Sequence, residues 1–505
     1  MSVPCSALSF PSPDEVRREY ASRGAFRYLV PGGGHGAAAV CRALLERGCR
    51  VAGVANPIDE GGHSARIRWD VYRHTGYWPI IPGDTMNLLG GGFCPPEVYA
   101  VTNSRLPKEP GRTAGELFAE VARSALAGAP EAGRLGLEAF ARWLEAMGEV
   151  IQERLIAPGI TPLPGASLQN LLHVGVMFHT GAYRRGIEEV DQGRYLSGSY
   201  LLEREMRADP NGLVCPMSFD KVTLVTRHAG GRTVVGGINR VLLAKGDGPN
   251  GLEYGDMVPN AMLPDAPPES DEEGARKCAR AKIVDWYPAE VRHGPTDEPF
   301  NDDWVFEEIR PRAPRINPFL VEIMRALEPG GAIIIPPGNA HESTYTFFVM
   351  DRVWEELLAA RDRGVRVVLV LNPVNLLLTA GYTVDDYLRA IEQALQHATG
   401  RGDISAEQVI DRIVVNDPSG APERAQRMMR GEGIPPEVKQ VLLHRTPTGP
   451  VTVSPQDIAR LQARGFEVVS RPMLSVETVS IRGIETEAIS YERDKLLDAI
   501  LSPAG

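Results

Sequence analysis

The feature that most constrains this fold is a strand, a glycine turn, a helix and a second strand near the start of the chain. Residues 26–30 read FRYLV, residues 31–36 read PGGGHG, and an Ala- and Leu-rich stretch over 37–48 leads into CRVAGVAN. Short apolar runs of this kind indicate buried strands, and a glycine after an apolar periodic stretch marks the end of a helix. The pattern therefore predicts a βαβ unit, which belongs to a parallel sheet.

The same alternation returns in the second half of the chain. Apolar runs at 332–335, 366–371 and 412–415 are separated by polar, helix-forming stretches, and Thr383 stands where it can cap one of these helices. Continuous β-branched runs between helices are typical of a parallel sheet covered on both faces. We therefore predict an α/β fold with a doubly wound, mostly parallel Rossmann-like sheet that carries helical and β-hairpin insertions.

On length alone, a chain of 505 residues is expected to form two or three domains, and it begins with an N-terminal extension over 1–24. Four insertions or additions are expected within it: helices at about 115–157, a further helix over 167–192, an antiparallel hairpin that turns at Gly230 and Gly231, and a Pro-, Gly- and acid-rich surface insertion or lid at about 243–303.

Composition narrows the classes of partner. The net charge of -11 argues against a nucleic-acid-binding protein, and the six cysteines form no C-x-x-C pair, so neither structural zinc nor a disulfide framework is expected. The first ten residues lack the pattern of a signal peptide, and no apolar run approaches the roughly 20 residues of a membrane span. A cytoplasmic protein with no membrane partner is predicted.

The first glycine turn can bring backbone amides close to a phosphate at a helix N-terminus. A tight strand-to-helix turn with no ligand is the alternative. His35, inside the turn, could add a hydrogen-bond donor. A dinucleotide site would need an acid at the end of the second strand, where this chain has Asn56.

Acids follow at Asp59 and Glu60, and again at Asp84, three residues before Asn87. Oxygen ligands of this kind suit Mg²⁺ beside a diphosphate. The alternatives are acids in the first turn of a helix and a simple capping role for Asp84. Arginines 66 and 68 are two residues apart, so at most one of them should face the same ligand from a helix.

A second glycine turn follows the strand at 332–335, with a polar group directly behind it: Asn339, His341, Glu342, Ser343 and Thr344. Two such turns in one sheet predict a crevice at the carboxyl edge of the strands. Ser167 and Asn170 begin a further helix that could face it. No G-x-S-x-G motif is present, so a hydrolase triad is not expected.

The order of these motifs resembles the superfamily that joins 2-phospho-L-lactate transferase to the gluconeogenesis-factor proteins of bacteria. The resemblance rests on GGGHG, NPIDE, DEGGHSARIRWD, IPGDTMN, SLQNLLHVGV and AIIIPPGNAHEST, in that order, and covers roughly residues 26–500. Departures from the family pattern are His35 for threonine, Glu60 for aspartate, Gln169 for glycine, and Asn339 with His341 inside the second turn.

The resemblance implies a single nucleotide-binding α/β domain over 25–505. It also implies a Mg²⁺-dependent transferase that uses a nucleotide diphosphate of GDP or UDP type and an unknown acceptor, and that forms a homodimer. A nucleotide-sugar-binding regulator without chemistry is the alternative, and an NAD-dependent oxidoreductase is a third that Asn56 disfavours. The implied catalytic residues are Asp59, Asp84, Arg66 and Arg68. The implied metal ligands are Asp59, Glu60 and Asp84. The implied ligand-binding residues are Gly32, Gly33, Gly34, His35, Gly36, Asn56, Asn87, Asn170, Gly338 and Ser343.

Overall fold

The protein is described by a computed structural model. The described residues are 8–56, 58, 62–75, 79–80, 82–107, 111–128, 131–161, 165–184, 189–220, 222–228, 233–235, 283–293, 306–376, 379, 381–429, 449–481 and 484–502.

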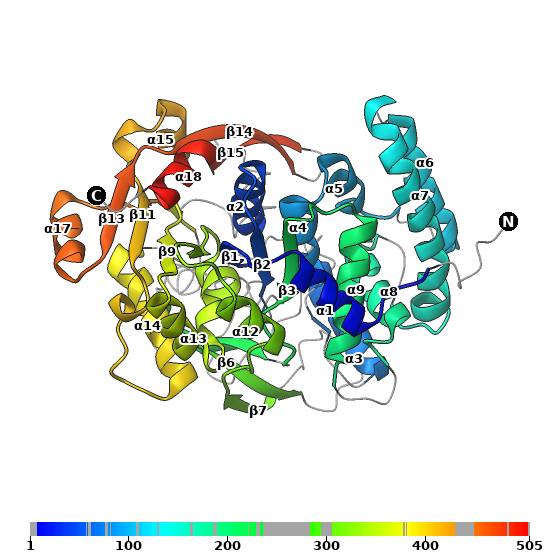
Figure 1. The fold of residues 1–505 in the computed structure, drawn as a ribbon, viewed down its shortest axis with the longest axis horizontal. Coiled ribbons are helices and arrows are strands. Elements are labelled where there is room, and N and C mark those ends of the chain that lie inside the picture. Colours follow the sequence, from blue (N-terminus) through cyan, green and yellow to red (C-terminus); the bar gives the residue numbers. More distant parts are fainter. Residues whose placement is uncertain are drawn as a thin grey trace, which may run out of the picture.

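A seven-stranded parallel sheet forms the centre of the molecule, in the order β13-β11-β9-β8-β1-β2-β3 (Figure 1). Its strands are β1 (Tyr28–Pro31), β2 (Val51–Ala55), β3 (Gly212–Pro216), β8 (Ala332–Ile335), β9 (Arg366–Val370), β11 (Arg412–Asn416) and β13 (Glu467–Arg471). The chain runs outward from β1 through β2 and β3, returns to pair β8 with the other side of β1, and then runs outward again. The predicted doubly wound α/β fold is confirmed.

Each strand of this sheet contributes side chains to two hydrophobic cores, one on each face, because successive side chains point to opposite faces of the sheet. Val30 and Ile334 lie in one buried cluster, whereas Leu29 and Ile333 lie in the other. The helices that contribute to the first cluster include α2 (His35–Glu46), α4 (Pro82–Phe93), α7 (Glu131–Ile151), α8 (Leu168–Thr180) and α18 (Arg493–Leu501). Those that contribute to the second include α1 (Pro13–Ser22), α12 (Pro318–Arg325), α13 (Val353–Asp362) and α14 (Val384–Thr399). The strands are therefore buried on both sides, as their continuous apolar runs require.

Residues 8–24, the described part of the N-terminal extension, belong to the folded body. Helix α1 packs on α9 (Gln192–Glu205), where the Tyr20 hydroxyl donates a hydrogen bond to the buried Glu203 carboxylate at 2.9 Å. The other helices and helical turns are α3 (Gly62–Thr75), α5 (Pro96–Thr102), α6 (Ala114–Gly128), η2 (Gln152–Ile156), η3 (Ala340–Thr344), η4 (Tyr345–Val349), η6 (Ala406–Gln408), η7 (Pro418–Gly420), α15 (Glu423–Met429) and α17 (Pro455–Ala463).

The helical insertion predicted at 115–157 is confirmed as α6, α7 and the turn η2, which pack together at one end of the molecule (Figure 1). The single helix predicted over 167–192 is wrong. Helix α8 stops at Thr180 because Gly181 adopts the left-handed conformation with φ of 73°. A new helix, α9, starts after Asp191, whose side chain accepts a hydrogen bond from the Arg194 amide at 3.0 Å.

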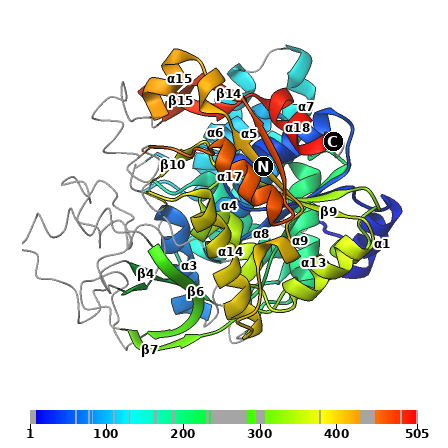
Figure 2. The same cartoon turned by 90° about the vertical axis from the view of Figure 1, so that its left-hand side faces the viewer.

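A four-stranded antiparallel sheet, ordered β5-β4-β6-β7, lies beside the main body (Figure 2). Its strands are β4 (Thr223–His228), β5 (Thr233–Val235), β6 (Ile283–His293) and β7 (Phe306–Pro311). The predicted hairpin is confirmed in β4 and β5, and its turn at Gly230 and Gly231 lies outside the described residues.

Strand β6 corrects the prediction that all of 243–303 is a surface insertion. Trp286 in this strand is fully buried, and its indole N–H donates to the Ala390 carbonyl of α14 at 2.9 Å. Burial of a large aromatic side chain with its polar atom paired anchors the strand to the main body. Residues 243–282 and 294–303 lie outside the described part of the chain.

Two small ribbons complete the fold. Strands β14 (Leu474–Ile481) and β15 (Ile484–Tyr491) form an antiparallel ribbon, which crosses the upper side of the molecule in Figure 1. Strands β10 (Val374–Asn375) and β12 (Gly449–Pro450) pair over two residues.

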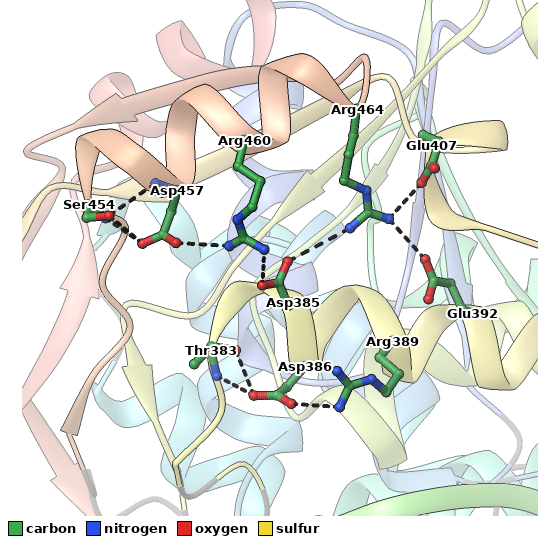
Figure 3. Close-up of polar contacts among 10 residues, drawn as sticks. All are labelled: Thr383, Asp385, Asp386, Arg389, Glu392, Glu407, Ser454, Asp457, Arg460 and Arg464. Carbon is green, nitrogen blue, oxygen red and sulfur yellow. Dashed lines mark hydrogen bonds and ion pairs between the residues drawn. The ribbon is translucent and has the colours of Figure 1, made fainter.

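Charged side chains join α17 to α14 (Figure 3). Arg460 pairs with Asp385 in the first turn of α14, and the Arg464 guanidinium lies 3.2 Å from Glu392 and 2.7 Å from Glu407. Most of these groups are part-exposed, so each pair contributes little alone, and the network fixes geometry more than stability.

Cys41, Cys49, Cys94 and Cys215 are free thiols, while Cys5 and Cys278 lie outside the described residues. Within the described ranges, no helix has both the length and the apolar character needed to span a membrane.

Candidate functional site

The two glycine turns meet at the point where the strand order reverses. Strand β1 leads into Gly32–Gly36 and its parallel neighbour β8 leads into Pro336–Gly338, so both turns lie at the same edge of the sheet. The Gly33 amide donates a hydrogen bond to the Ser343 hydroxyl at 3.2 Å. This topological switch point is where open α/β sheets bind ligands.

The first turn requires glycine because its backbone lies very close to the second turn and to Asp84. An ideal Cβ on Gly36 would overlap the carbonyl oxygen of Pro337 in the second turn, and one on Gly33 would overlap the Asp84 carboxylate. Gly32 also has a φ of 136°, which other residues rarely adopt. The predicted glycines therefore bring two turns and an acid into contact at the N-terminus of α2.

Asn56 and Asp84 are brought together by β2 and α4. Asn56 is fully buried at the end of β2, its side-chain N–H donates to the Asp84 carboxylate, and its carbonyl accepts from the Ile58 amide at 2.8 Å. Asp84, in the first turn of α4, is part-exposed. The asparagine thus orients the carboxylate against the glycine turn.

One helical turn beyond Asp84, α4 meets the start of α8. The Asn87 side-chain carbonyl accepts a hydrogen bond from the Gln169 amide at 3.2 Å and from the Tyr99 hydroxyl at 3.4 Å. Asn170, the next residue of α8, is buried with an exposed fraction of 2%. The site therefore extends from the glycine turns to the N-terminus of α8.

The second turn is held by polar residues on three elements. The Asn372 amide, just after β9, donates to the Gly338 carbonyl at 2.6 Å, and the Asn339 amide donates to the Glu342 carboxylate at 2.8 Å. His341 and the Tyr382 hydroxyl lie 3.2 Å apart. Burial raises the pKa of the Tyr382 phenol above its ordinary value, so this hydroxyl stays neutral.

Two residues that hold this turn were not among the predicted binding residues: Glu342, which is buried and was noted only as part of the polar group behind the turn, and the part-exposed Asn372. Asn372 stands two residues after β9 and Glu342 seven residues after β8, and a position beyond the carboxyl end of a strand was the available signal. Ser343, which was predicted, is buried beside the first turn with an exposed fraction of 8%.

Of the remaining predicted site residues, some lie outside the described part of the chain, and the others lie in α2 or α3. Asp59 and Glu60 lie outside the described residues, and Arg66 lies in α3 at a position whose side chain is not described. Arg68 is buried and its guanidinium donates to the Pro79 carbonyl at 2.8 Å, so it supports the α3–α4 connection. His35 is exposed at the first position of α2.

Among the described residues, no group of three or more His, Cys, Asp or Glu side chains is arranged to hold a metal ion. The histidines of α8 have partners of their own: His173 lies 2.9 Å from the Tyr195 hydroxyl, and His179 lies 2.7 Å from the Leu8 carbonyl oxygen.

Fold and site together define a doubly wound α/β protein with two glycine turns in contact at its switch point. No family model and no curated protein matches the sequence. Two solved structures of protein BH3568 from Bacillus halodurans are similar to it, and one is described as a member of the UPF0052 family. They are 19% and 18% identical, with TM-scores of 0.49 and 0.51, and the matches cover 95% of this chain and 100% of theirs. At this identity the second likeness shows a shared fold.

Proposed function

We propose that this chain is a Mg²⁺-dependent transferase that moves a phosphorus-containing group from a nucleotide diphosphate adduct to an acceptor, as 2-phospho-L-lactate transferase does. The observation that carries the proposal is the direct contact of the two glycine turns at the switch point. The amides of Gly34 and Gly36 would bind the diphosphate at the positive end of α2, and the Gly33 amide would exchange its hydrogen bond to the Ser343 hydroxyl for one to the ligand. The UPF0052 family of the similar solved structure is consistent with the superfamily that the motifs resemble.

Asp84 fits the proposed Mg²⁺. Its part-exposed carboxylate lies beside Gly33, and Mg²⁺ commonly binds one or two protein carboxylates together with substrate phosphates. Asp59 and Glu60 would supply further oxygen ligands by resemblance. Bound Mg²⁺ would offset negative charge on the transferred group.

Arg66 is the better candidate for a second positive charge. Its neighbour Arg68 is buried against the Pro79 carbonyl, and two residues spaced by two do not share a helix face. Positioning and charge neutralisation suffice for phosphoryl-type transfer, so the proposal needs no protein nucleophile.

A nucleotide-sugar-binding regulator is the second candidate. The longer motifs favour the gluconeogenesis-factor branch, and the described residues contain no metal-ligand cluster. An oxidoreductase is disfavoured because Asn56, at the position of the ribose-binding acid, has its amide directed to Asp84 and Ile58. The expected acceptor and the expected homodimer stay predictions.

A thermal-shift panel with GDP, GTP, UDP, UDP-N-acetylglucosamine, ADP and NAD, each with and without Mg²⁺, tests the proposal. A ligand present at roughly 100 times its Kd should add about 2.7 kcal/mol to the free energy of unfolding. Stabilisation by a nucleoside diphosphate that needs Mg²⁺ supports the transferase. Metal-independent stabilisation by the UDP-sugar supports the regulator, and stabilisation by NAD alone contradicts both.

The variant Asp84→Asn tests the metal assignment within this panel. The amide preserves shape but lacks the charge that Mg²⁺ requires, so the Mg²⁺-dependent part of the shift should disappear. The matched control is Asp362→Asn, at the exposed end of α13. Equal Mg²⁺ dependence in both variants would remove Asp84 from the metal site.

A further inference from the structure

The side-chain amide of Gln169, next to the proposed diphosphate site, has a carbonyl oxygen without a hydrogen-bond partner. Gln169, in the first turn of α8, has an exposed fraction of 8%, and its N–H₂ group donates to the Asn87 carbonyl at 3.2 Å. Its own side-chain carbonyl oxygen is buried and has no hydrogen-bond partner. A buried acceptor without a partner is unfavourable, and a ligand donor would remove that cost.

The position of Gln169 links this oxygen to the glycine turn. Asn87 follows Asp84 on the same face of α4 by three residues, which is about 4.5 Å of helix rise. Asp84 in turn lies against Gly33, and both Asp84 and Asn87 are part-exposed. A series of contacts therefore runs from Gly33 through Asp84 and Asn87 to Gln169.

Asn87 supplies the complementary group. Its carbonyl oxygen takes the hydrogen bonds from Gln169 and Tyr99, while its N–H₂ group has no hydrogen-bond partner among the described residues. A free donor and a free acceptor thus belong to two amides in direct contact. A hydroxyl group both donates and accepts, and can satisfy the two together.

We propose that Gln169 and Asn87 bind a hydroxyl of the sugar attached to the diphosphate. This inference rests on the proposed function, in which a nucleotide diphosphate binds at the glycine turns. It adds that the amide pair beyond Asp84 recognises the sugar of that ligand. A sugar is favoured over a nucleobase because the amide pair lies only one helical turn from Asp84, and the base lies beyond the sugar. The sugar is either the ribose of the nucleotide or a glycosyl group on the other phosphate.

Isothermal titration with UDP-N-acetylglucosamine, UDP, GDP and pyrophosphate, all with Mg²⁺, tests this proposal. The variant Gln169→Met removes the acceptor at similar volume, and Asn87→Ala removes the donor from the other helix. The matched control is Gln462→Met, at an exposed position of α17. The expected result is about tenfold weaker binding of the sugar-containing ligands to each variant, with pyrophosphate binding unchanged.

The pattern across ligands identifies the sugar. Weaker binding of UDP, GDP and UDP-N-acetylglucosamine alike assigns the pair to the ribose, whereas weaker binding of UDP-N-acetylglucosamine alone assigns it to the glycosyl group. Unchanged affinities in both variants, or an equal loss for pyrophosphate, would overturn the inference while the proposed function stands. If the wild-type chain binds none of the four ligands, the proposed function fails and this inference fails with it.

Discussion

The contact between the two glycine turns can be tested by adding one methyl group. Gly36 is the second residue of α2, and a Cβ there would overlap the carbonyl oxygen of Pro337. Pro337 stands two residues after the buried strand β8 and has little freedom to retreat, since the obstacle is backbone and not the end of a flexible side chain. Gly36→Ala should therefore push the turns apart.

The expected magnitude combines two opposite effects. Overpacking a close contact costs about 1–3 kcal/mol, and a rigid backbone atom places this case near the upper end. Alanine in a helix is about 1 kcal/mol more favourable than glycine. The net expectation is a loss of about 2 kcal/mol in the free energy of unfolding, together with weaker binding of any diphosphate.

Urea unfolding of wild type, Gly36→Ala and Gly34→Ala provides the measurement. Gly34 is the control from the same turn, because its nearest heavy atom is the Ser343 hydroxyl oxygen at 3.7 Å and its φ is -89°. Alanine is a poorer N-cap than glycine, so the control should lose only about 0.5 kcal/mol. A Gly36→Ala protein as stable as wild type, or more stable, would refute the close approach of the turns.

Two buried titratable groups give opposite pH dependences. Burial lowers the pKa of His173 to about 3, so the unfolded chain binds more protons below pH 6.5, and His173→Gln should lessen the loss of stability on acidification by about 2 kcal/mol at pH 5 in urea unfolding. Burial raises the pKa of Glu203 to about 7, so its favourable contribution is complete below pH 4.5 and is lost as the pH rises through 7. Glu203→Gln should remove up to about 3 kcal/mol of this alkaline loss, and a pH profile parallel to wild type for either variant would contradict the assignment.

Local features of the fold were predictable because their causes are local. Thr383 and Asp386 form the capping box of α14, and both partners are three residues apart in the sequence (Figure 3). The strands β1, β2, β8, β9 and β11 were likewise visible as apolar runs. In contrast, Arg460 and Asp385 are 75 residues apart, and no periodicity indicates their pairing.

The two wrong predictions of secondary structure have different causes. One depends on the conformation of a single residue, and the other on packing between residues far apart in the sequence. The predicted helix over 167–192 overlooked Gly181, a single left-handed residue that ends α8. Strand β6 lies inside a segment whose composition resembles a surface loop, and tertiary packing of Trp286 on α14 overrides that composition. Composition averages over a window, so it misses one well-packed strand.

In the candidate site, the type of a residue could be read from the sequence, whereas its hydrogen-bond partner could not. Asn56 was noted because it is not the acid of a dinucleotide site. The motifs placed it in the same ligand site as Asp84, but no sequence pattern predicts the hydrogen bond between these two residues, which are 28 positions apart. The fold makes the two hydrogen-bonded neighbours. An aspartate at position 56 would set two carboxylates against each other and raise the pKa of one of them. The amide that disfavours a dinucleotide therefore also holds Asp84 as an oriented carboxylate beside the glycine turn, which is consistent with the proposed site for a diphosphate and Mg²⁺.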